Sequence, residues 1–264
     1  MQAISLMYHD ICDEANSSGF SGADAALYKI MVSDFIAHLD VISKNSNEKP
    51  RRVTELKDQQ HSIFITFDDG GVSALRAADL LEKKGWYGHF FITTSKIDST
   101  TFVSKSEIKE LHRRGHVIGT HSDSHPLRMA SLPTAQINSE WRISVERLTQ
   151  ITGEKITAAS VPGGLYSKKV AKCAAENGIK YLFNSEPTTK IQKVADCLIL
   201  GRFAVQNGMK DGEVSTIING DIFPRLKRNL IWNFKKPLKK IGGESFLKIR
   251  KFLIEQKTNK KSLF

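Results

Sequence analysis

The chain has 264 residues, of which 40% are hydrophobic and 25% are charged, and only three are cysteines. This composition is typical of a globular protein with a sizeable core, and three scattered cysteines argue against a disulfide framework or a cysteine metal cluster. Every apolar run is too short to cross a bilayer, and the first ten residues lack the basic start of a signal peptide, so we expect a cytoplasmic protein.

The formal net charge of +11 is concentrated at the end of the chain. Residues 225–264 contain 13 Lys or Arg and two Glu, whereas residues 1–224 contain 26 basic and 26 acidic side chains. Because the body is neutral, it lacks the basic surface of a nucleic-acid-binding protein, and we expect no nucleic acid partner.

Three segments precede the regular part of the sequence. Residues 6–9 are interpreted as a short strand that ends in a histidine, and residues 26–42 as an amphipathic helix. Residues 43–61 are polar and charged, which indicates a linker or a surface loop.

From residue 62 onward, strands alternate with helices. Strands are expected at residues 62–67, 87–93, 116–120, 155–161, 180–183 and 197–200, and helices at residues 74–84, 104–114, 133–151, 167–177 and 212–218. This alternation indicates parallel βαβ units, and roughly six of them favour a barrel over an open sheet. In both α/β architectures, functional sites gather at the C-terminal ends of the strands.

Polar side chains follow two of these strands. Asp68 and Asp69 come directly after residues 62–67, in a string that would also suit an ordinary turn. His121 and His125 follow residues 116–120 with metal-ligand spacing, and the alternative is a polar loop with two unrelated histidines. Together, one carboxylate and two imidazoles suit a catalytic divalent metal with open coordination positions, and the second carboxylate is then free to accept a proton.

The string Thr66-Phe67-Asp68-Asp69-Gly70, taken with His121-Ser122-x-x-His125, resembles the polysaccharide deacetylases, which are carbohydrate esterase family 4 or the NodB homology domain. The resemblance covers residues 4–205. It implies an α/β fold, a distorted (β/α)7 barrel like a TIM barrel, that removes N-acetyl groups from amino sugars of glycans. It also implies that Asp68 is the general base and that the metal ligands are Asp69, His121 and His125. These ligands suit Zn²⁺, with Co²⁺, Ni²⁺ or Mn²⁺ as alternatives.

Two other motifs of the family are altered. Ser160 stands where the third motif usually has an arginine, whereas Gly163 keeps the following turn and offers its N–H as an oxyanion donor. Arg202 is the candidate replacement for the missing arginine, and the alternative is an ordinary surface arginine. The late histidine of the family is absent. His9 resembles the general acid of permuted family members, and the alternative is a structural histidine.

The sequence therefore predicts a metal-dependent hydrolase that acts on an N-acetylated glycan. The alternative, prompted by the altered third motif, is a degenerate glycan-binding module of the same fold without turnover. No catalytic role is expected for the other histidines, which are His38, His61, His89, His112 and His116.

The last 42 residues are predicted to lie outside the barrel of residues 1–222. Apolar residues in 223–264 recur at three- and four-residue steps, and most Lys and Arg side chains fall off that stripe. Such a basic amphipathic helical tail suits an anionic membrane, which predicts peripheral attachment to the inner face of the cytoplasmic membrane. The alternative is a stripe that packs on the barrel while its charges are solvated.

Overall fold

The computed structural model describes residues 2–13, 17–46, 48–57, 61–221 and 230. Within these residues, one curled sheet has the strand order β11-β1-β4-β5-β6-β7-β8-β10-β9, and only β9 runs antiparallel to its neighbour. The strands are β1 (Gln2–Tyr8), β4 (His61–Phe67), β5 (His89–Ile92), β6 (Val117–Thr120), β7 (Ala158–Ser160), β8 (Tyr181–Phe183), β9 (Gln192–Val194), β10 (Cys197–Leu200) and β11 (Phe203–Ala204).

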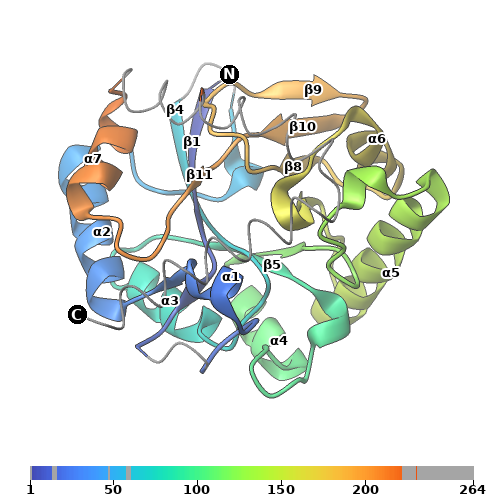
Figure 1. The fold of residues 1–264 in the computed structure, drawn as a ribbon, viewed down its shortest axis with the longest axis horizontal. Coiled ribbons are helices and arrows are strands. Elements are labelled where there is room, and N and C mark those ends of the chain that lie inside the picture. Colours follow the sequence, from blue (N-terminus) through green and yellow to red (C-terminus); the bar gives the residue numbers. More distant parts are fainter. Residues whose placement is uncertain (1, 14–16, 47, 58–60, 222–229, 231–264) are drawn as a thin grey trace.

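Helices cover the outside of this curled sheet (Figure 1). They are α2 (Val32–Asn45), α3 (Ala74–Glu82), α4 (Lys105–Arg113), α5 (Thr134–Thr152), α6 (Lys168–Glu176) and α7 (Asp211–Asn219), together with the single turn α1 (Ala23–Ala26). The short helical turns are η1 (Val53–Glu55), η2 (Thr94–Lys96), η3 (Met129–Ser131) and η4 (Pro162–Gly164). This arrangement confirms the expected distorted (β/α)7 barrel.

Both faces of the sheet are buried, which explains why its strands are almost continuously apolar. In β4, Ile63 and Ile65 pack into the layer between sheet and helices, whereas Phe64 faces a smaller inner core. Phe91 and Phe183 belong to the same inner core. The barrel is therefore filled by side chains, and polar groups gather at its C-terminal end.

Local capping explains where the helices begin and end. Ser104 is the N-cap of α4, and its hydroxyl accepts the Glu107 N–H at 3.3 Å. Ser167 caps α6 in the same way by accepting the Val170 N–H at 3.3 Å. Helix α5 ends at Gly153, whose φ of 78° lies in the left-handed region that glycine adopts without strain.

The N-terminal expectations need two corrections. The helix expected at 26–42 is wrong in its first part, because β3 (Lys29–Ile30) pairs there with β2 (Asp10–Ile11) and α2 begins only at Val32. The segment 43–61, expected to be a linker or a surface loop, contacts the barrel core in its described part, which a linker would not do. Val53 is buried in it, and the Val53 N–H donates to His89 Nε2 at 2.8 Å.

Among the described helices, none has the length and hydrophobicity that a bilayer-spanning segment requires.

Candidate active site

The first part of the site is the Asp-Asp pair that follows β4. The Asp68 N–H donates to the Tyr8 carbonyl at 3.0 Å, so the β1–β4 pairing continues one residue beyond the strand. Asp69 has a φ of 77°, a conformation that few residues other than glycine adopt. Both side chains are buried. The turn thus presents two carboxylates inside the mouth of the barrel, where adjacent negative charges require compensation.

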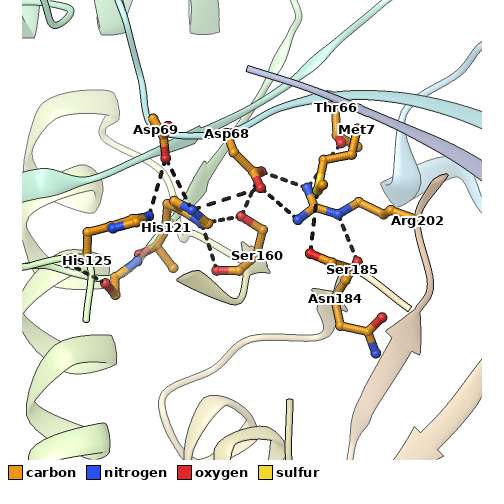
Figure 2. Close-up of polar contacts among 12 residues, drawn as sticks. Met7, Thr66, Asp68, Asp69, His121, His125, Ser160, Asn184, Ser185 and Arg202 are labelled. Carbon is orange, nitrogen blue, oxygen red and sulfur yellow. Dashed lines mark hydrogen bonds and ion pairs between the residues drawn. The ribbon is translucent and has the colours of Figure 1, made fainter. Parts of the chain in front are cut away.

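Arg202 compensates the first of these charges (Figure 2). It lies between β10 and β11 and is fully buried. Its guanidinium donates two parallel hydrogen bonds to Asp68, Nη1 to Oδ1 at 2.6 Å and Nη2 to Oδ2 at 2.7 Å. Its Nε–H donates to the Asn184 carbonyl at 3.0 Å, which fixes the plane of the guanidinium. Burial raises the pKa of Asp68, but the charge and hydrogen bonds of Arg202, together with the nearby histidines, outweigh burial and hold that pKa well below its usual range. Asp68 is therefore ionised, and Arg202 is not a surface arginine.

Ser160, the last residue of β7, links Asp68 to the first histidine. Its hydroxyl donates to Asp68 Oδ1 at 3.0 Å and lies within hydrogen-bond distance of His121 Nδ1. The Ser160 carbonyl is 3.1 Å from the same Nδ1. With acceptors on that side, His121 carries its proton on Nδ1, and the lone pair of Nε2 faces the other way.

The two histidines come from one irregular loop after β6. Ser122 organises it, because its N–H donates to Thr120 Oγ1 at 3.0 Å and its hydroxyl accepts the His125 N–H at 3.1 Å. Ser122 and His125 have φ values of 67° and 60°, so the loop is not a helical turn. Left-handed backbone in non-glycine residues is costly and tends to cluster at functional sites.

Asp69 and the two histidines form a compact group. The Nε2 atoms of His121 and His125 each lie 3.4 Å from Asp69 Oδ1, and one ligand atom from each residue lies within 4.8 Å of the others. Burial is the main cause that lowers the pKa of His121 from 6.5 to about 4, so its imidazole is neutral near pH 7. Burial raises the pKa of Asp69, yet the contact with His125 and the histidine charges leave it below its ordinary value. Neutral imidazoles around a carboxylate are the donor set that a divalent transition metal requires.

His9 comes directly after β1, the strand that pairs with β4, whose end carries the two aspartates. Its charge is among the causes that lower the pKa values of both Asp68 and Asp69, so it faces the same site. Its ring stacks on Tyr28, with centroids 4.3 Å apart and 28° between the planes. Nδ1 of His9 is buried and has no hydrogen-bond partner among the residues that the structure describes.

Gly163 lies in η4, just after Ser160, with a φ of 62°. A Cβ atom built on Gly163 would lie 2.4 Å from the Leu127 carbonyl oxygen, so only glycine fits between η4 and the chain after His125. The turn therefore packs against the loop that carries both histidines.

The sequence alone does not identify three residues that contact the site. One is the hydroxyl of Ser160, which donates to Asp68. The position of Ser160 in the altered third motif is a sequence signal for this contact. Tyr28 gave no signal, because its stacking on His9 depends on the pairing of β2 with β3. Glu140 of α5 also gave none, and its Oε2 accepts the N–H groups of Asp123 and Ser124 at 3.0 and 2.8 Å, which supports the histidine loop.

The structure is thus an α/β barrel that gathers two carboxylates, two histidines and a buried arginine at the C-terminal ends of its strands. The polysaccharide deacetylase family model matches residues 55–182. YxkH of Bacillus subtilis (strain 168) is 26% identical over 190 residues, which are 69% of this chain and 64% of that protein. The peptidoglycan-N-acetylmuramic acid deacetylase PdaA of the same strain is 28% identical over 128 residues, 47% of each chain.

Solved structures share the fold. The polysaccharide deacetylase BC0361 from Bacillus cereus superposes with a TM-score of 0.69 at 21% identity, covering 83% of this chain and 69% of that one. The matches to YxkH and PdaA each span less than two thirds of those relatives. Sequence and fold agree that this chain is similar to the polysaccharide deacetylases.

Proposed function

We propose that the protein is a metal-dependent hydrolase that removes N-acetyl groups from amino sugars of a polysaccharide or a glycan intermediate. The observation that carries this proposal is the group of Asp69, His121 and His125 directly beside the ionised Asp68. The match to the polysaccharide deacetylase family model supports the reaction class, and the names of relatives such as the peptidoglycan-N-acetylglucosamine deacetylase PgdA of Listeria monocytogenes support an N-acetylated glycan as substrate.

The donor set fits a divalent metal. Two buried imidazoles and one carboxylate match Zn²⁺, and Co²⁺, Ni²⁺ and Mn²⁺ accept the same ligands. Bound there, such a cation supplies Lewis-acid polarisation of the acetyl carbonyl and activation of a water.

The side chains around this position have complementary tasks. Asp68 accepts a proton from the attacking water, because Arg202 keeps it ionised and fixes its plane. The Gly163 N–H donates to the oxyanion of the tetrahedral adduct. His9 gives a proton to the nitrogen of the amino sugar as the carbon–nitrogen bond breaks, so acetate and a free amine are released.

Arg202 also supports the hydrolase over the non-hydrolytic glycan-binding module. That alternative was prompted by the missing motif arginine. A buried arginine with two contacts to Asp68 supplies what the motif lacks, which favours the hydrolase.

The test is acetate release from an N-acetylglucosamine oligomer. We expect release by the metal-loaded protein, its loss on chelation, and recovery when Zn²⁺ or Co²⁺ is added back. Full activity of the chelated, metal-free protein would contradict the mechanism, and binding of the oligomer without release would favour the binding module.

We also propose that residues 223–264 form a basic tail, separate from the barrel of residues 1–222, that attaches a cytoplasmic enzyme to the inner face of the membrane. Apart from Leu230, these residues lie outside the described part of the structure. The proposal is supported by the concentration of basic residues there and by α7, which ends at Asn219. Each Lys or Arg near an anionic surface contributes roughly 1 kcal/mol. Salt-sensitive co-sedimentation with anionic liposomes is expected for the full chain and not for a chain ending at Ile222. Equal behaviour of the two would remove the membrane role.

A further inference from the structure

A buried ion pair lies next to His9 and outside the catalytic group. Lys29 Nζ is 2.8 Å from Asp10 Oδ2, and the two residues are 5% and 3% exposed. Removing two charges from water is costly, and apolar residues in their place are often equally stable. We therefore look for the role of this pair in the chain segments that it holds in place, and not in its contribution to stability.

The pair is the centre of a hydrogen-bond network that joins three chain segments. Asp10 Oδ1 accepts the hydroxyl protons of Ser18 and Ser73, at 2.5 and 3.0 Å. Ser73 in turn donates its N–H to Ser18 Oγ at 2.9 Å, and its hydroxyl oxygen accepts the Ile11 N–H at 3.1 Å. The chain after His9, the loop at Ser18 and the chain after the Asp-Asp pair are thus bonded to one carboxylate.

Two glycines leave this carboxylate no room to move. A Cβ atom on Gly71 would lie 2.1 Å from Asp10 Oδ1, and one on Gly19 would lie 2.3 Å from Oδ2. Gly71 is only two residues beyond Asp69. The carboxylate of Asp10 therefore sets how closely the strand end that carries His9 approaches the turn that carries the base.

The same pair places the ring that stacks on His9. Asp10 is the register partner of Lys29 in the β2–β3 pairing, and the Asp10 N–H approaches the Tyr28 carbonyl at 3.5 Å. Tyr28 is thereby held beside His9, with the ring centroids 4.3 Å apart. Because His9 Nδ1 has no hydrogen-bond partner in the described part of the chain, stacking and the main chain orient this imidazole.

We propose that Asp10 and Lys29 are positioning residues that, through Tyr28 and the main chain, hold His9 in the orientation in which it gives its proton to the leaving amine. This inference rests on the proposed function. The ion pair touches neither the proposed metal ligands nor Asp68, so its most direct effect is on the placement of the proton donor.

The kinetic test uses two variants. The double variant Asp10→Asn/Lys29→Met leaves neither charge buried alone, and Tyr28→Leu removes only the stacked ring. Misplacement of a catalytic group by about 1 Å costs about 10²-fold in rate. We expect kcat for acetate release to fall by about 10- to 100-fold in both variants, with KM and zinc affinity unchanged. Leu148→Ala is the control, because Leu148 is buried in α5 away from the network and its loss lowers stability alone. Wild-type kcat in the two folded variants would overturn the proposal.

A second readout does not depend on activity. In the wild-type protein the Tyr28 ring should shift the His9 ring protons upfield in the NMR spectrum, with the His9→Gln spectrum providing the assignment. We expect this shift to disappear in the double variant and in Tyr28→Leu and to persist in Leu148→Ala. If the double variant keeps the shift, the positioning proposal is wrong. If the shift disappears but the wild-type protein releases no acetate, the proposed function fails and the positioning stands.

Discussion

Asp68 shows how one side chain can be both buried and ionised. The Arg202 fork engages both of its oxygens, and Ser160 adds a third hydrogen bond on Oδ1. Oδ2 is left with a free lone pair and lies 3.9 Å from His121 Nε2, on the side of the histidines (Figure 2). The proposed base is therefore aimed at the proposed metal position by contacts from the ends of two other strands, β10 and β7.

The first prediction concerns the Arg202 fork. Arg202→Lys keeps the positive charge but cannot make two parallel contacts, so Asp68 loses its fixed plane. We expect kcat to fall by about 10- to 100-fold while zinc affinity is unchanged. Arg142→Lys is the control, because Arg142 forms an exposed pair with Glu146 and should keep wild-type kcat. An unchanged kcat in Arg202→Lys would mean that charge alone is sufficient.

The second prediction separates the two aspartates. Asp68→Asn removes the proton acceptor and turns an amide N–H₂ group toward the Arg202 donors, so we expect kcat to fall by about 10²–10⁴-fold with metal still bound. Asp69→Asn should instead weaken zinc binding, measured by calorimetry. The opposite pattern would reverse the assignment of base and ligand.

At the scale of elements, the sequence predicts best where strands and helices alternate. The strand expected at 62–67 and the helix expected at 104–114 match β4 and α4 closely, because burial on both faces and a Ser cap leave clear local signals. The expected metal ligands and base are brought together for the same reason, since they follow strands directly.

What the sequence could not predict depends on contacts between distant residues. The two-residue strand β3 exists only because Asp10 and Ile11 pair with it, so a helix was expected there. Likewise, β11 has two residues and forms by pairing with β1. The bonds of Arg202 and Ser160 to Asp68 join residues that are 134 and 92 positions away, and no local pattern encodes such distances.

The third prediction concerns His89, which fastens η1 to the sheet. Its Nδ1–H donates to the Ile65 carbonyl at 3.0 Å and its Nε2 accepts the Val53 N–H, so the neutral ring is required. Burial is the main cause that lowers the pKa of His89 from 6.5 to about 4. Between these pH values the unfolded chain binds more protons, so the free energy of unfolding falls as the pH falls from 6.5 to 4, by up to about 3 kcal/mol.

His89→Gln keeps an acceptor for Val53 but does not titrate. Urea unfolding of both proteins at a series of pH values should show a shallower loss of stability in His89→Gln across that window. Parallel curves would show that other buried histidines, such as His121, account for the whole effect.

At the scale of the whole molecule, the proposed metal binding should be linked to folding. Asp69 follows β4, whereas His121 and His125 follow β6, so only the folded barrel presents all three donors. Zinc at 100 times its dissociation constant should stabilise the protein by about 2.7 kcal/mol. We expect a rise in Tm of roughly 5–10 °C. This rise should disappear in His125→Ala and persist in His112→Ala, whose histidine lies outside the metal group. A rise in Tm in His125→Ala would place the metal elsewhere.

The position of β1 between β11 and β4 has a consequence for synthesis of the protein. Leu6 pairs with Phe203, which lies 197 residues later in the chain. Arg202, the partner of Asp68, directly precedes Phe203. At about 5–20 residues per second, a ribosome needs roughly 10–40 s to bridge that interval. Before Arg202 is made, the nascent chain already contains the proposed base and all the proposed metal ligands. At that stage the base still lacks the arginine that holds it ionised. The proposed site can therefore be completed only after Arg202 has been made, and a chain that ends before Arg202 is expected to be inactive.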